Sequence, residues 1–251
     1  MDLEKSKNEF IKYTENYDLK DINIERKQKH SIRVMNISKE IAKGIGITQA
    51  EIDIATLIGL LHDIARFEQY TKYHTFKDSQ SIDHGDLGEE ILNKEIRKYI
   101  ETEEYDKIIK LAVKNHNKYK IQEGLSPKEK IFAQIIRDAD KIDILYESVE
   151  MFWKKEENLV ENSEISPEVF NQFIQKNQVK IENRRTPIDN IISVIAFIFD
   201  INFKISFEII KREDYINKIL NRYKIKNIDT KEKIEKIREI ANSYIEQKIK
   251  E

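Results

Sequence analysis

The stretch ATLIGLLHDIA, residues 55–65, decides how the rest of the sequence is interpreted. Apolar residues at helical spacing, among them Leu57, Ile58 and Leu61, lead directly to the adjacent pair His62 and Asp63. We therefore expect this pair to lie deep inside a buried helix. A buried imidazole or carboxylate costs free energy unless it finds a polar partner. Other parts of the chain must supply those partners.

Two further histidines and one aspartate stand in comparable apolar settings. His30 begins an apolar stripe with helical spacing, His116 ends another, and Asp140 shares its predicted helix face with apolar residues. Periodicity alone leaves Asp138 and Asp143 as alternatives to Asp140. A single buried histidine is usually a hydrogen-bonded core residue, whereas several histidines and carboxylates together are readily satisfied by a shared cation such as Zn, Fe, Mn or Ni. With His84 included, the predicted metal ligands are His30, His62, Asp63, His84, His116 and Asp140.

This ordered set resembles the HD-domain superfamily of metal-dependent phosphohydrolases, over roughly residues 25–146. The run His62-Asp63-Ile-Ala-Arg66 is similar to the HDIGK or HDIGR segment of its two-metal branch, and His84-Gly-Asp-Leu-Gly88 is similar to the His-x-x-x-Gly step. Asn115-His116 and Ala139-Asp140-Lys141 resemble the last two ligand segments, and the run from Arg66 to His84 is similar to bacterial HD hydrolases of unassigned substrate. The resemblance implies an all-α helical bundle with one or two divalent transition metals, Mn, Fe, Ni or Zn, with Mg as a further candidate.

The resemblance also implies how the ligands are shared. Asp63 would bridge one metal, held by His30, His62 and Asp140, and a second metal, held by His84 and His116. Two such cations activate a water molecule and orient a phosphate ester, with nucleotides among the candidate substrates.

Two departures from the family's patterns restrict the substrate. Asn115 stands where the HD-GYP type carries the first of two adjacent histidines, and no Gly-Tyr-Pro segment follows Lys118, so hydrolysis of cyclic dinucleotides is not implied. Arg66 occupies the position at which the small HD 5'-nucleotidases carry a catalytic glutamate.

Three functions fit this ligand set. The leading one is a metal-dependent phosphohydrolase in which Asp63 and Arg66 are catalytic and a small phosphorylated molecule is the substrate. The second is a di-iron oxygenase, because some HD relatives cleave C–C or C–P bonds with the same ligand order. The third is a non-catalytic sensor of a nucleotide or a metal.

Arg66 is the strongest candidate for binding the substrate. It lies at i+4 from His62 and i+3 from Asp63, so its side chain reaches the same cavity. We interpret it as a guanidinium that orients the phosphate, the alternative being a surface arginine at a helix end.

Weaker candidates flank the ligand positions. Lys118 and Lys141 are predicted to bind the substrate's anionic groups, although most lysines are solvated in a chain with 36% charged residues. Gly59 admits either a closely packed helix or the substrate. His74 lacks an apolar stripe and stays outside the metal set.

Composition favours a cytoplasmic enzyme. The chain has no cysteine, which excludes disulfides and thiolate chemistry, and its net charge of −2 carries no strong signal for nucleic acid. The N-terminal residues have no apolar signal core, and the most apolar run, residues 191–199, is too short to span a membrane and predicts a buried helix opened by Thr186 and Pro187.

The sequence divides into a chemically rich first half and a glycine-free second half. All five histidines and all six glycines lie between His30 and Gly124. We predict an HD metal-binding core over residues 1–150 and a helical region packed on it over residues 151–251. An apolar stripe on the last segment, residues 230–251, is expected to pack on its own core, with a homodimer contact as the alternative.

Overall fold

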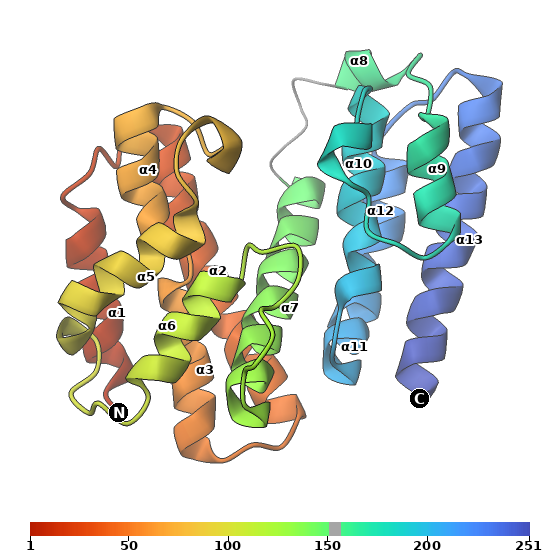
Figure 1. Cartoon of the computed structure of the whole chain (residues 1–251). Helices are drawn as coiled ribbons and strands as arrows, with labels where there is room; N and C mark the ends of the chain where they lie inside the picture. The colour runs from red at the N-terminus through yellow and green to blue at the C-terminus, as the bar shows by residue number, and fades with distance from the viewer. Residues whose placement is uncertain (151–156) are drawn as a thin grey trace. The chain divides into compact units, whose positions relative to one another are not determined.

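The computed structural model describes residues 1–150 and 157–251, and among these residues it contains helices and turns but no strand (Figure 1). The predicted all-α class is therefore confirmed. The chain divides into two compact units, Met1–Asp140 and Lys141–Glu251. The longest helix, α7 (Pro127–Glu150), contributes residues to both units. The predicted domain boundary at residue 150 stays a prediction.

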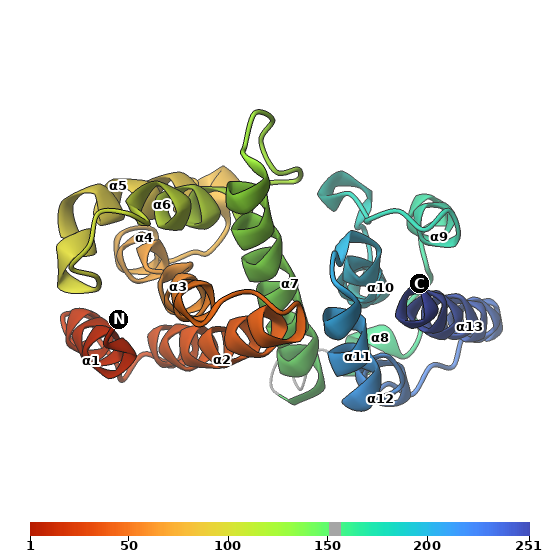
Figure 2. The ribbon, with the colours of Figure 1, turned by 90° about the horizontal axis from the view of Figure 1, so that it is seen from below.

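The first unit contains every histidine of the chain and is made of helices joined by short turns. Its helices before α7 are α1 (Leu3–Thr14), α2 (Ile22–Gly44), α3 (Gln49–Leu61), α4 (Ala65–Tyr73), α5 (His84–Glu95) and α6 (Asp106–Asn115). Single 3-10 turns occur at Asp78–Gln80 and Ile96–Lys98. The pairs α2 with α3 and α5 with α6 pack side by side (Figure 2).

Local sequence sets where the helices begin. Glu51 and Thr48 exchange backbone and side-chain hydrogen bonds in a capping box at the start of α3. At the start of α7 the Ser126 amide donates to the Glu129 carboxylate at 2.7 Å, and the Glu129 amide donates to the Ser126 hydroxyl at 3.3 Å. Each box satisfies two backbone groups that a helix terminus leaves without partners. The sequence spacings Thr48-x-x-Glu51 and Ser126-x-x-Glu129 predict both helix starts, and the structure confirms them.

Two glycines allow helices to approach closely within the first unit. A Cβ atom at Gly59 would lie 2.9 Å from the Met35 Cα atom of α2, and one at Gly88 would lie 2.8 Å from the Val113 side chain of α6. Gly59 therefore allows close contact between α2 and α3. Of its two predicted roles, this is the one of admitting a closely packed helix. The two glycines bring together the elements that carry His30, His62, His84 and His116.

The predicted position of His62 and Asp63 deep inside a helix is wrong. Helix α3 ends at Leu61 and α4 begins at Ala65, so the pair lies on the turn that joins them. There the Ile64 amide donates to the Leu61 carbonyl at 3.0 Å, and the Arg66 amide donates to the Asp63 carbonyl at 2.9 Å, which are tighter i to i−3 bonds. Consecutive side chains of a regular helix diverge by about 100°. His62 Nε2 and Asp63 Oδ2 nonetheless lie 3.6 Å apart, so both side chains face one centre.

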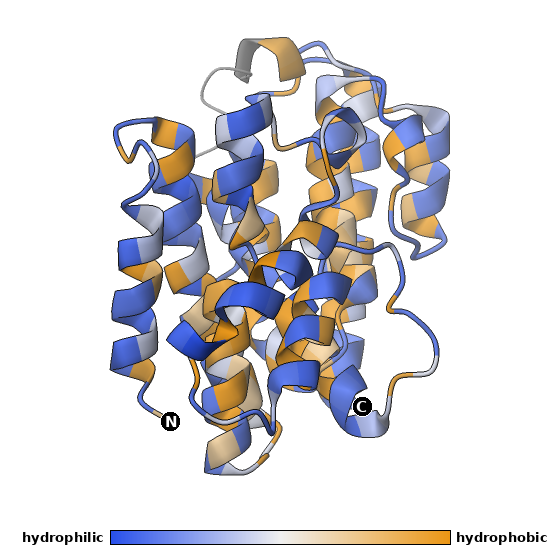
Figure 3. Cartoon of the chain, turned by 60° about the vertical axis from the view of Figure 1, so that its left-hand side comes forward, coloured by the Kyte–Doolittle hydropathy of each residue, from blue (hydrophilic) through white to orange (hydrophobic). Residues whose placement is uncertain are grey.

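The second unit is also helical. After α7 come α8 (Glu157–Val160), α9 (Pro167–Ile174), α10 (Pro187–Ile195), α11 (Lys204–Arg212), α12 (Tyr215–Asn221) and α13 (Ile228–Lys250), with 3-10 turns at Ile181–Asn183 and Ala196–Asp200. Thr186 caps α10 through a capping box, and Pro187 is its first residue, as predicted. The apolar stripe of α13 is buried in the single chain, as expected for packing on its own core. Hydrophobic and hydrophilic residues alternate along the helices (Figure 3). None of the described helices has the length and apolar character needed to cross a membrane.

Candidate metal centre

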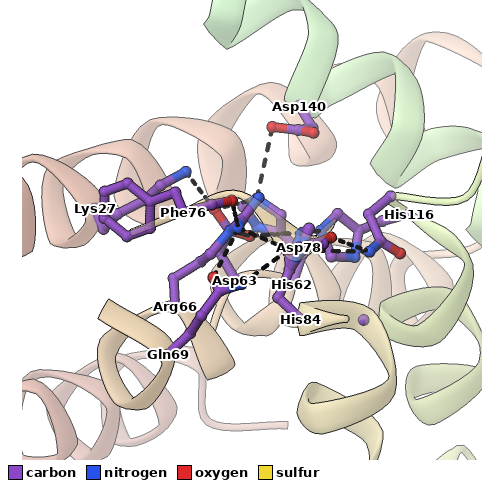
Figure 4. A network of polar contacts seen from close by, with 12 residues as sticks. Lys27, His62, Asp63, Arg66, Gln69, Phe76, Asp78, His84, His116 and Asp140 are labelled. Atoms are coloured by element: carbon purple, nitrogen blue, oxygen red, sulfur yellow. Dashed lines mark hydrogen bonds and ion pairs between the residues drawn. The ribbon is translucent and has the colours of Figure 1, made fainter. Parts of the chain in front are cut away.

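The six predicted ligands come together inside the first unit, although they arise from five separate places along the chain. Figure 4 labels all of them except His30. His30 lies in the middle of α2, and His62 and Asp63 lie on the turn between α3 and α4. His84 is the first residue of α5, His116 directly follows α6, and Asp140 lies in α7. All but Asp140 are at least 96% buried, and the side chain of Asp140 is 19% exposed. Chemically reactive groups are therefore concentrated in a largely dry interior.

The nitrogen atoms of the four histidines form two pairs. The Nε2 atoms of His30 and His62 lie 3.2 Å apart, and those of His84 and His116 lie 3.0 Å apart. We call the group of His30, His62 and Asp140 the first half of the centre, because the Asp140 Oδ1 atom lies 3.2 Å from His30 Nε2 and 3.7 Å from His62 Nε2. His84 and His116 form the second half.

Asp63 lies between the two halves and presents one oxygen to each. Its Oδ2 atom is 3.5 Å from His30 Nε2 and 3.6 Å from His62 Nε2. Its Oδ1 atom is 3.5 Å from His84 Nε2 and 3.4 Å from His116 Nε2. The carboxylate thus has the orientation of a bridging ligand.

The spacing of these atoms fits metal coordination. With metal–ligand bonds of about 2.0–2.1 Å, ligand atoms around one cation lie about 3.0 to 3.4 Å apart for octahedral to tetrahedral angles. The ligand atoms of His30, His62 and Asp140 all lie within 4.8 Å of one another, and so do those of His62, Asp63 and His116. The donor set of imidazole nitrogen and carboxylate oxygen suits Zn, Fe, Mn or Ni. The residues present therefore fit one or two divalent cations.

Three of the imidazole rings are held so that Nε2 faces the centre. The Nδ1 atom of His62 lies 2.9 Å from the Gly59 carbonyl, and that of His116 lies 2.6 Å from the Val113 carbonyl. The Nδ1 atom of His84 lies 2.7 Å from a carboxylate oxygen of Asp78. When Nδ1–H donates to an oxygen, the lone pair on Nε2 is left to bind a metal. The surrounding structure thus selects the tautomer that a metal site requires.

The electrostatic environment favours the protonation states of metal ligands. Burial lowers the pKa of His62, and burial together with the charge of Arg66 lowers the pKa of His84 to about 4. Burial by itself would raise the pKa of Asp63, but the charge of Lys27 and the nearby His62, His116 and Arg66 together outweigh burial and hold that pKa well below its ordinary value. At Asp140 the adjacent His30 and His62 similarly outweigh burial and lower the pKa well below the usual range. Neutral imidazoles and ionised carboxylates are the forms that bind metals.

Arg66 lies beside the centre, as predicted, but its guanidinium is engaged by a neighbouring loop. Its Nε atom is 3.4 Å from Asp63 Oδ1. One terminal nitrogen donates to Gln69 Oε1 at 2.7 Å, to the Phe76 carbonyl at 2.7 Å and to Asp78 Oδ1 at 3.2 Å. Because Asp78 also contacts His84, Arg66 and His84 are linked through one carboxylate.

The other predicted site residues have different surroundings. Lys118 forms ion pairs with Asp83 at 2.7 Å and with Asp86 at 3.0 Å. Lys141 is 7% exposed and forms an ion pair with Asp200 at 2.8 Å within the second unit. The substrate-binding role of both lysines stays a prediction.

His74 lies apart from the metal ligands, in keeping with its exclusion from the set. It is exposed and ends α4 in the left-handed backbone region, with φ of 53°. Its ring contacts Tyr70, with 6.3 Å between the ring centroids.

Sequence reasoning missed two residues that contact the predicted ligands, Lys27 and Asp78, and a third, Gln69, that contacts Asp78. Lys27 donates to Asp63 Oδ2 at 2.7 Å, Asp78 contacts His84 and Arg66, and Gln69 donates to Asp78 Oδ1 at 2.9 Å. Lys27 precedes His30 by three residues, a spacing that places both on one face of a helix. That spacing was the available signal for Lys27, whereas Asp78 lies in a polar loop with no periodic pattern.

Comparison with known proteins gives one match. Residues 28–145 match the family model described as HD domain, a range that contains all six predicted ligands. No curated protein and no solved structure matches the chain.

Proposed function

The chain belongs to the HD-domain superfamily, and from its centre we propose that the protein is a metal-dependent phosphohydrolase acting on a small phosphate ester. One observation carries the proposal. The two oxygens of Asp63 face different pairs of histidine nitrogens at 3.4 to 3.6 Å, as a carboxylate that bridges two cations would. Proteins with paired cations commonly use them in displacement at phosphorus.

Divalent cations at such a site lower the pKa of bound water toward neutrality and polarise a phosphoryl oxygen. The residues of the chain prepare that chemistry. His30, His62 and Asp140 provide one set of donor atoms, His84 and His116 provide another, and Asp63 fixes the spacing between the two sets. The rigid hydrogen bonds at Nδ1 keep the rings in place, so little reorganisation is needed when the substrate binds.

Arg66 is proposed to stabilise negative charge on the phosphoryl group. Its side chain is 14% exposed, and its Nε atom lies next to Asp63 Oδ1. Burial in a medium of low dielectric constant strengthens the attraction between a guanidinium and a phosphate. The hydrogen bonds to Phe76 and Asp78 orient the guanidinium before the substrate arrives.

The test uses protein loaded with Mn²⁺ under exclusion of oxygen, assayed with p-nitrophenyl phosphate and a panel of nucleotides. We expect release of phosphate or phenol from at least one of these esters. Arg66→Ala should lower kcat/KM by roughly 100-fold while metal content is retained, because the substitution removes charge stabilisation and not a ligand. Arg185→Ala is the matched control, since Arg185 is 63% exposed and pairs with Glu168 in the second unit.

Two results would contradict the proposal. Phosphate esters that stay intact with every metal, together with oxygen consumption by the ferrous protein in the presence of an organic substrate, would identify an oxygenase. Nucleotide binding at micromolar concentration without turnover in either assay would identify a sensor.

A further inference from the structure

We propose that Lys27 binds the phosphate group of the substrate and that, through its charge, the site prefers phosphate monoesters to diesters. This inference rests on the proposed function, because it assigns a substrate class to the same centre. Lys27 lies on α2, one helical turn before His30. This spacing places its ammonium group beside the first half of the centre.

The contacts of Lys27 place its charge at the bridging carboxylate. Its Nζ atom lies 2.7 Å from Asp63 Oδ2, the oxygen that faces His30 and His62, and the lysine side chain is 12% exposed. Asp63 is the hydrogen-bond partner of this ammonium among the described residues. An ammonium group has three N–H donors, so two remain for a ligand or for solvent. We expect an oxygen of a phosphate bound at the centre to lie within reach of these donors.

Arg66 and Lys27 differ in how much of their charge is already balanced. The guanidinium of Arg66 shares Asp78 with His84, and one of its terminal nitrogens is occupied by Gln69 and the Phe76 carbonyl. Lys27 shares its one carboxylate, Asp63, with Arg66 and with any cation that the centre holds. The positive charge of Lys27 therefore adds to that of any cations held there.

Phe76 supports this arrangement from one side. The Nζ atom of Lys27 and the guanidinium carbons of Arg26 and Arg66 lie 5.5, 5.7 and 5.6 Å from the centroid of its ring, within the range of cation–π attraction. The ring is itself stacked on Tyr70, with 4.7 Å between centroids. Figure 4 shows Lys27 and Phe76 next to each other, on the side of Asp63 away from His116. Phe76 thereby helps to hold the ammonium group of Lys27 beside the centre.

This charge selects between classes of phosphate ester. A monoester carries close to two negative charges above its second pKa of about 6, whereas a diester carries one. An additional cation attracts the dianion about twice as strongly as the monoanion. Lys27 is therefore expected to contribute more to the binding of a terminal phosphate than to the binding of a phosphodiester.

The test measures binding without turnover. Phosphorus-31 line broadening in protein loaded with Mn²⁺ reports binding of inorganic phosphate, a dianion at pH 8, and of dimethyl phosphate, a monoanion. Lys27→Met should weaken phosphate binding by about 10- to 100-fold, the size expected for a hydrogen bond to a charged group. Dimethyl phosphate should lose about 3- to 10-fold, the square root of that factor. Lys29→Met, on the exposed face of the same helix, is the matched control and should change neither.

Two further variants keep the test decisive. Lys27→Arg keeps the charge and should keep most of the phosphate binding. Lys27→Gln keeps a donor for Asp63 without the charge, so it should weaken phosphate binding as much as is predicted for Lys27→Met. It replaces the methionine variant in the test if that variant fails to fold.

Each outcome has a defined meaning. If Lys27→Met weakens the binding of inorganic phosphate and of dimethyl phosphate equally, or weakens neither, the assignment is overturned. Loss of Mn²⁺ from Lys27→Met would also overturn it, because it would show that Lys27 acts by orienting Asp63. Wild-type protein that binds Mn²⁺ and phosphate but hydrolyses no ester would refute the proposed hydrolase while leaving the comparison of Lys27 variants valid. Wild-type protein that takes up no metal would refute both.

Discussion

Asp78→Asn should weaken the second half of the metal centre selectively. Asp78 Oδ2 lies 2.7 Å from His84 Nδ1, and it contacts neither His30 nor His62. Neutralising a carboxylate that holds a ligating histidine typically costs 10- to 100-fold in metal affinity, or about 1.4 to 2.7 kcal/mol. The Asp78 side chain is 30% exposed, so solvent screens part of its effect, and we expect a loss of about 10- to 30-fold.

The assay is a titration of metal-free protein with Mn²⁺, followed by the electron paramagnetic resonance of the free ion and fitted to two sites. The second half has fewer ligands than the first half, so we expect it to be the weaker of the two sites. Its affinity for Mn²⁺ should fall further in Asp78→Asn, and the affinity of the tighter site should stay within about twofold of wild type. Asp86→Asn is the control, because it makes the same chemical change at a residue that pairs with Lys118. Equal weakening of both sites, or wild-type affinity at both, would refute the division of the centre into two halves.

Two further predictions follow from the same geometry. Asp63→Asn should abolish activity and sharply lower the metal content measured by elemental analysis, because it removes the charge shared by both halves, whereas His74→Ala should keep wild-type metal content; equal metal loss in the two variants would show that the ligand set is misassigned. In metal-free protein the free energy of unfolding should fall as the pH drops from about 6.5 toward 4, because the folded pKa of His84 is about 4 and the unfolded chain takes up this proton first. The loss from this group is about 3 kcal/mol over that range. Urea denaturation between pH 7 and pH 4.5 measures most of it, and a flat profile would contradict the burial argument.

The helical class and most of the candidate ligand set could be predicted because their signals are local. His30, His116 and Asp140 each stand on an apolar helix face, and a buried polar group on such a face needs a partner. The capping boxes at Thr48 and Ser126 fixed two helix starts from side-chain chemistry alone. Apolar helix faces and capping boxes can be recognised in the sequence without knowledge of the three-dimensional arrangement.

The parts that could not be predicted depend on long-range contacts. Asp78 lies in a polar loop, and its role arises only once α5 brings His84 next to it. Lys27 is one of several basic residues at the start of α2, and only its spacing of three residues from His30 distinguishes it from Lys29 on the exposed face. Its contact with Asp63 depends on the packing of α2 against the turn after α3. The turn at His62 and Asp63 was hidden because the apolar pattern continues through it, as it would in a helix.

On the proposed ligand set, the distribution of the six residues along the chain limits when a metal site can form. The first donor is residue 30 and the last is residue 140, so a ribosome releases the complete set only after synthesising the whole of the intervening sequence. At ordinary rates of translation that interval lasts on the order of ten seconds. On this proposal the nascent chain has no complete metal site until residue 140 has been synthesised. Selection among Mn, Fe, Ni and Zn would then be made by the folded protein and by the metals available to it.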